Sequence, residues 1–160
     1  MNWLIGLHAL LGEIGAFSFF WILIDLVGPN SENSFIRARW AALMGTISLF
    51  LSWIVGGYYY LGNYQTLVKP VIKSGPYPWT HSVVTETKEH VFLLLPFLAL
   101  YIYSLLHEES PQTMVLNEKG RLNIMMLAAA VFVMGLSMAA MGYLISSGFR
   151  SALEVKATSL

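Results

Sequence analysis

Cysteine is absent from the 160 residues of the chain. Its absence excludes disulfide bonds, thiolate-bound metal ions, iron–sulfur clusters and covalently attached haem. The side chains that remain as ligands for a metal ion or a haem iron are those of histidine, glutamate, aspartate and methionine.

Charged residues are also scarce. They form 11% of the chain, whereas a soluble domain of average composition contains about 25%. The net charge is zero and no run of basic residues occurs, so the sequence predicts no nucleic-acid partner. Hydrophobic residues instead form 56% of the chain, and the mean hydropathy is +0.62. This composition indicates an integral membrane protein.

Four apolar segments are each longer than the roughly 20 residues that a helix needs to cross the hydrocarbon core. We therefore predict an all-α fold, an integral membrane four-helix antiparallel bundle that forms one domain over residues 1–160. The expected helices lie at about residues 3–27, 35–61, 82–106 and 122–149. Gly28 and Pro29 act as the stop signal of the first helix. Because the number of spans is even, both termini are expected on the same side of the membrane.

The segment between the second and third helices, Gly62 to His81, has an unusual composition. It contains three prolines, two glycines and three large aromatic residues. A disordered linker would be poor in aromatic residues. We therefore predict an ordered, aromatic and proline-rich loop that caps the bundle at the membrane surface. The alternative is a plain interfacial segment that Trp79 and two lysines hold at the headgroups.

Five ionisable residues lie where a membrane span should have none. They are His8 and Glu13 in the first helix, and Glu86, Glu89 and His90 in the third. The uncharged run after His90 has only 16 residues, so the third helix must reach back to Glu86 to cross the bilayer. Ionisable groups at that depth cost a few kcal/mol each unless they are paired or ligated. The cluster therefore predicts a functional site.

Distances counted along the helices place these side chains at one level. His8, Glu13, His90 and Met138 lie roughly 21 to 28 Å from the same membrane face, at 1.5 Å per residue. Glu86 and His90 share a helix face because they are four residues apart. We therefore expect His8, Glu86 and His90 to converge. The alternative is that Lys88 pairs with one glutamate and the histidines form hydrogen bonds within the bundle.

The chemistry of such a site has two interpretations. A haem b iron needs two axial ligands on facing helices, which His8 and His90 would supply. A non-haem iron, copper or zinc ion would use the carboxylates as well. The candidate metal ligands are then His8, Glu13, Glu86, Glu89, His90 and Met138. The Glu-x-x-His repeats of di-iron proteins are absent, which argues against a site of that type. No catalytic residue is assigned.

We expect a subunit that carries out electron transfer, or faces a quinone, within a larger membrane complex. One alternative is a copper transporter or copper-handling protein, because Met134, Met138 and Met141 recur at helical spacing and thioethers select Cu(I). Such a methionine stripe is also typical of simple packing. A second alternative is a structural subunit without a cofactor. The small-residue faces of the second and fourth helices would then pack against other membrane subunits or a second copy, with lipid around them.

At the opposite membrane face, the sequence places a second group of polar residues near the helix ends. The group consists of Asp25, Arg37, Arg39 and His107. We expect a surface ion pair among them, because charges of both signs meet at one level.

Overall fold

The computed structural model describes residues 3–27 and 31–158, and every regular element in those two ranges is a helix. The α-helices are α1 (Trp3–Val27), α2 (Glu32–Tyr59), α3 (Lys69–Ser74), α4 (Glu86–Glu108), α5 (Pro111–Leu116) and α6 (Glu118–Thr158). Two segments, η1 (Tyr60–Val68) and η2 (Thr80–Thr85), have the wider π-helical turn. The all-α prediction is confirmed. The predicted stop signal at Gly28 and Pro29 lies outside the described residues.

Four continuous helical segments are long and apolar enough to cross a membrane. They are Trp3–Val27, Glu32–Ser74, Thr80–Glu108 and Glu118–Thr158. Large apolar side chains such as Trp21, Ile54 and Val133 are exposed on their surfaces. An apolar outer surface is what lipid-facing helices require, so the chain has the character of a multi-pass membrane protein.

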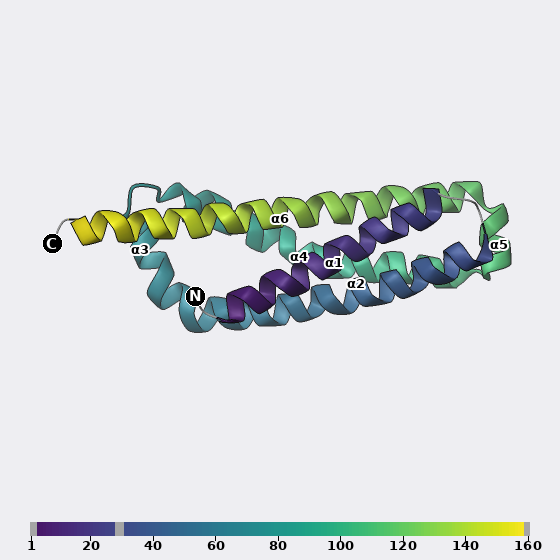
Figure 1. The fold of residues 1–160 in the computed structure, drawn as a ribbon, viewed down its shortest axis with the longest axis horizontal. Helices are drawn as coiled ribbons and strands as arrows, with labels where there is room; N and C mark the ends of the chain where they lie inside the picture. Colours follow the sequence, from purple (N-terminus) through teal and green to yellow (C-terminus); the bar gives the residue numbers. More distant parts are fainter. Residues whose placement is uncertain (1–2, 28–30, 159–160) are drawn as a thin grey trace.

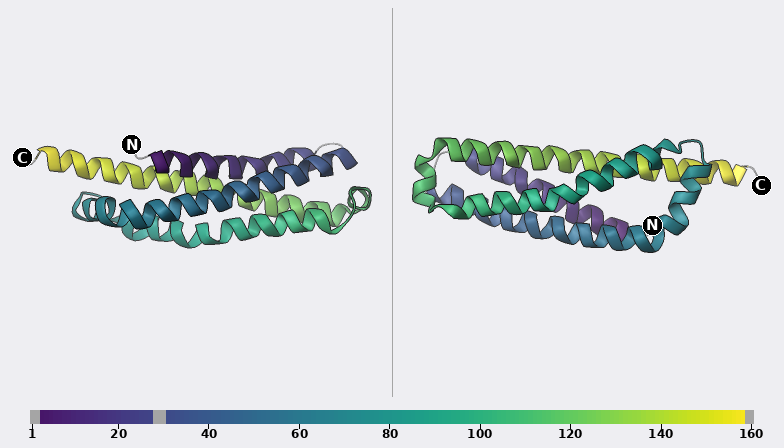
Figure 2. Two further views of the ribbon diagram at one scale, coloured as in Figure 1. Left: turned by 90° about the horizontal axis from the view of Figure 1, so that it is seen from below. Right: turned by 180° about the vertical axis from the view of Figure 1, so that it is seen from behind.

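The long helices lie side by side in an elongated molecule (Figure 1 and Figure 2). α1 packs against α2 and α6, and α4 also packs against α2 and α6. The beginning of α1 and the end of α6 lie toward one end of the molecule, together with α3, while α5 lies at the other (Figure 1). We call these the α3 end and the α5 end.

Small residues allow the helix backbones to approach closely. A Cβ atom added to Gly45 of α2 would lie 2.6 Å from the ring of Phe19 on α1. A Cβ atom on Gly135 of α6 would lie 2.6 Å from the side chain of Ala16 on α1. Both glycines are therefore used for contacts within the chain. The largest side chains of the core fill the space between these contacts and include Phe19, Phe35, Ile22, Leu49, Leu95, Ile102 and Ile124.

The predicted loop at residues 62–81 is wrong for most of its length. α2 continues through η1 and α3 as far as Ser74, and a helix resumes at Thr80. Pro70 lies in the first turn of α3, where its missing N–H is tolerated. Tyr64 and Ile72 are buried, so packing favours the helical conformation of this segment. Of the three prolines, Pro76 and Pro78 lie in the break between the helices, at residues 75–79.

The fourth predicted helix is longer than expected. α6 runs to Thr158, beyond the predicted end at residue 149, and packs against α3 and η2. A Cβ atom on Gly148 would meet Thr80, and one on Gly75 would meet Ala152. These contacts continue the packing beyond the predicted end at residue 149, so the helix does not end there.

Candidate functional site

His8 is held in one orientation between α1 and α2. Its Nδ1 atom lies 2.9 Å from the main-chain oxygen of Ser52 and 3.0 Å from the Ser52 hydroxyl, which itself donates to the His8 main-chain oxygen at 2.9 Å. Because a carbonyl oxygen only accepts, Nδ1 carries the proton and Nε2 is left with a lone pair. Gly56 makes room for the ring, since a Cβ atom there would lie 2.7 Å from Nδ1.

The other side of the His8 ring faces α4. The ring packs edge-on against Phe92, with 5.5 Å between the ring centroids, and lies within the electrostatic influence of Lys88. The Lys88 ammonium group points toward α6, where it lies 3.2 Å from the Cβ position of Gly142. Among the described residues Lys88 has no carboxylate within salt-bridge distance. The alternative of an ion pair between Lys88 and a glutamate therefore has no contact to support it.

Glu86 and His90 lie on the outward face of α4. Both side chains are exposed, and both line a shallow hollow together with Ser82 and Thr87. The Nδ1 atom of His90 lies 2.6 Å from the main-chain oxygen of Glu86. The carbonyl again requires the proton on Nδ1, so the lone pair of Nε2 is available to a ligand on the surface.

The structure does not bring His8 and His90 together. Phe92, which contacts His8, follows His90 by two residues, and two residues correspond to about 200° around a helix. The two imidazoles therefore lie on opposite sides of α4. In the described ranges no group of three or more His, Asp or Glu side chains could hold a metal ion. The sequence predicts the heights of these residues, but the rotation of each helix depends on packing.

The remaining candidate ligands are spread over different surroundings. Glu13 is exposed on α1. Glu89 is half-buried, and its Oε1 atom is buried without a hydrogen-bond partner among the described residues. Met138 is buried in the core of the molecule, with Met134 and Met141 packed against that core. The three methionines therefore pack in the core, which is the usual role of a methionine stripe.

A buried hydrogen-bond chain at the α3 end was not predicted. His81 Nδ1 lies 3.0 Å from the Tyr64 hydroxyl, which lies 2.9 Å from Thr85 Oγ1, and Thr85 donates to the Thr80 main-chain oxygen at 2.9 Å. His81 therefore donates to Tyr64, and Tyr64 donates to Thr85. All four residues are at most 5% exposed. The sequence feature that could have predicted this chain is the four-residue spacing of His81 and Thr85. That spacing places the two side chains on one face only if the segment is helical, whereas we predicted a loop there.

The α5 end holds charged contacts. Arg37 forms an ion pair with Asp25, with 2.6 Å between Nη2 and Oδ1. Arg39 donates to the main-chain oxygens of Leu106 at 2.6 Å and Glu109 at 2.5 Å, and so ties α2 to the end of α4. The predicted ion pair is therefore present between Asp25 and Arg37. His107 takes no part in it and instead bonds to the Tyr103 main-chain oxygen at 2.8 Å.

No protein-family model, curated protein or solved structure matches this chain.

Proposed function

We propose that this chain is a membrane subunit that binds a metal centre on the outward face of α4, through Glu86 and His90, and that a second membrane subunit completes the ligand set. The centre is a haem b iron or a non-haem iron, copper or zinc ion. In the haem form the complex would transfer electrons, with a quinone as the natural membrane-soluble partner. The observation that carries the proposal is the exposed Glu86–His90 pair within an apolar span.

The membrane position follows from exposed aromatic residues. Trp3, Tyr58 and Tyr143 are each at least 67% exposed, and such residues mark membrane–water interfaces. Tyr58 is about 27 Å from Trp40 along its helix, and Tyr143 is about 33 Å from Arg121. Both lengths match a hydrocarbon core of about 30 Å. In this placement both termini lie on the same side of the membrane.

His90 then lies just inside the hydrocarbon boundary, and Glu86, about 30 Å along α4 from Leu106, lies at that boundary. His90 is about 24 Å along α4 from Leu106, whose main-chain oxygen binds Arg39 at the α5 end. An exposed ionisable side chain costs less at this level than at the bilayer centre, but it is still partly desolvated by the surrounding lipid. A metal ion with ligands from a neighbouring subunit would remove this cost.

The local geometry of His90 suits a metal ligand. Metal-binding histidines commonly donate the second ring N–H to a carbonyl, which fixes the tautomer and the ring orientation. The Glu86 main-chain oxygen supplies that carbonyl. The Glu86 carboxylate lines the same hollow, so one chain offers an imidazole and a carboxylate together.

Two ligands from one chain do not complete a site. A zinc ion takes four ligands and a six-coordinate haem iron takes two axial ones. A second copy related by a two-fold axis would supply the same pair, because a two-fold interface repeats each residue. The exposed alanines of α6 (Ala130, Ala139 and Ala140) leave a further surface for neighbouring subunits.

The test is purification in mild detergent, followed by an absorption spectrum and metal analysis by mass spectrometry. A Soret band identifies haem, and bound iron, copper or zinc without that band identifies a non-haem centre. His90→Ala and Glu86→Gln should each lower metal occupancy by about tenfold or more. His107→Ala is the matched control, because His107 is exposed on the same helix with the same Nδ1–carbonyl contact. Wild-type protein without a metal, or equal loss in the control, would contradict the proposal.

A second candidate function is copper handling at an interior site. It is supported by the fixed His8 ring, whose Nε2 has no hydrogen-bond partner among the described residues, and by the buried thioether of Met138. Imidazole and thioether ligands select Cu(I). If His8→Ala and Met138→Leu abolish Cu(I) binding while His90→Ala retains it, the interior site replaces the outward one.

A further inference from the structure

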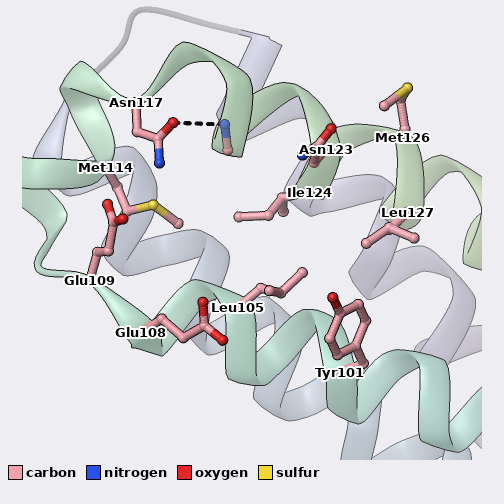
Figure 3. Close-up of a pocket in the computed structure, with 11 residues that line it drawn as sticks. Tyr101, Leu105, Glu108, Glu109, Met114, Asn117, Asn123, Ile124, Met126 and Leu127 are labelled. Carbon is pink, nitrogen blue, oxygen red and sulfur yellow. Dashed lines mark hydrogen bonds between the residues drawn. The ribbon is translucent and has the colours of Figure 1, made fainter.

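A pocket of about 370 Å³ opens at the α5 end, between the last turns of α4, α5 and the beginning of α6 (Figure 3). Its volume lies within the range of small-molecule sites. It is at the opposite end of α4 from Glu86 and His90, so it is independent of the proposed metal centre.

One end of the pocket is apolar on both of its sides, and we call this lining the apolar wall. Leu105 from α4 and Ile124 and Leu127 from α6 point toward one another across the space (Figure 3). The side chain of Tyr101 extends this wall along α4 and is 52% exposed. The apolar wall therefore continues toward the lipid-facing surface, where an acyl chain would enter.

The other end of the pocket, toward α5, is acidic. Glu108 and Glu109 line it, and no lysine or arginine does. The Oε2 atom of Glu109 is buried and has no hydrogen-bond partner among the described residues. The neighbouring cation, Arg39, is directed at the main-chain oxygens of Leu106 and Glu109. A buried carboxylate oxygen without a partner is costly, so a cationic donor would fit here.

A hydrogen-bond donor lies beside the carboxylates. Asn117 Oδ1 accepts from the Gly120 main-chain N–H at 2.9 Å, as the dashed line in Figure 3 marks. The amide nitrogen of Asn117 is therefore the part of that side chain left to donate, and Figure 3 shows it on the pocket side. A donor that lines the same pocket as two carboxylates suits a head group that carries both a phosphate and an ammonium.

We propose that this pocket binds the head group of an ethanolamine phospholipid. The ammonium lies against Glu108 and Glu109, the phosphate accepts from Asn117, and the first part of an acyl chain lies along Leu105 and Ile124. A bare divalent cation would use the oxygen ligands alone and would leave the apolar wall without a role.

The test is native mass spectrometry of the full-length protein with phosphatidylethanolamine and phosphatidylglycerol of identical acyl chains. Wild-type protein should retain phosphatidylethanolamine about tenfold better, since hydrogen bonds to charged groups discriminate by that order. The double variant Glu108→Gln, Glu109→Gln should lose this preference. Glu118→Gln is the matched control, because Glu118 is an exposed neighbouring acid that does not line the pocket.

Further measurements distinguish the intact lipid from soluble molecules and ions that could bind the same groups. Soluble glycerophosphoethanolamine has the head group without acyl chains and should compete only weakly. Equal retention of the two lipids, or an ethanolamine preference that survives the double variant, would overturn the proposal. Binding of glycerophosphoethanolamine as tight as that of the lipid, or displacement of the lipid by millimolar Ca²⁺ alone, would also overturn it.

Discussion

The two ends of this molecule hold polar groups in different ways. At the α5 end, full charges bind partners on other elements: Arg37 binds Asp25, and Arg39 binds main-chain oxygens at the end of α4. At the α3 end, a neutral chain of hydrogen bonds from His81 through Tyr64 is buried, while Glu86 and His90 face outward.

This difference separates polar groups that stabilise the fold from polar groups that are available to bind a ligand. A polar group whose partners lie within the chain stabilises the fold and needs no ligand. In the part of the chain that the structure describes, the outward pair at the α3 end has only a hydrogen bond within its own helix, between His90 and the Glu86 main chain. Substitutions at the satisfied groups should therefore change stability, while substitutions at the outward pair should change binding. The following predictions test the satisfied groups, from the largest expected effect to the smallest.

Arg39→Met should lower the free energy of unfolding by about 3 kcal/mol, because two charge-assisted hydrogen bonds between α2 and the end of α4 are lost. The measurement is denaturant unfolding in mixed micelles, followed by circular dichroism. Arg150→Met is the control, because Arg150 is exposed and, among residues 3–27 and 31–158, binds only Ser146 on its own helix. If the two variants lose equal stability, the α5 end does not depend on its charged contacts.

Tyr64→Phe should lower the free energy of unfolding by about 2 kcal/mol, since it leaves the buried His81 donor without an acceptor. The same unfolding assay measures it, with Tyr58→Phe as the control because Tyr58 is 70% exposed. The cost should not change between low and high salt, because the lost contacts are neutral. A strong salt dependence would contradict the neutral hydrogen-bond chain.

Arg37→Met should cost about 1 kcal/mol at low salt, because the Arg37 side chain is half-exposed although Asp25 is buried. The cost should fall when salt is added, as screening weakens an exposed charge pair. Measuring Arg37→Met and Tyr64→Phe side by side at two salt concentrations sharpens the contrast between the ends. If salt changes the cost of both substitutions equally, the two ends do not differ in the kind of polar contact that stabilises them.

The sequence predicts much of the fold because long apolar runs leave few alternatives. It does not predict the continuation of α2 past Gly62, because a proline such as Pro70 normally ends a helix. Only the structure shows that Pro70 lies in the first turn of α3, where a proline is tolerated. It also predicts the heights of His8 and His90 but not their directions. The direction of His8 depends on how closely α1 approaches α2, which Gly56 and Ser52 determine around its ring. The direction of His90 depends on the rotation of α4, which brings Phe92 against His8.

The length of α6 has a consequence for what can reach this protein. Its 41 residues extend about 61 Å, and even a tilt of 40° leaves about 47 Å along the membrane normal. The hydrocarbon core takes up only about 30 Å of that length. In the membrane placement proposed above, α6 continues about 22 Å past Tyr143 and so extends beyond the headgroups, and α3 and η2 are packed along this projecting part. This rigid platform is where antibodies, proteases and soluble partner proteins should make their first contact with the molecule.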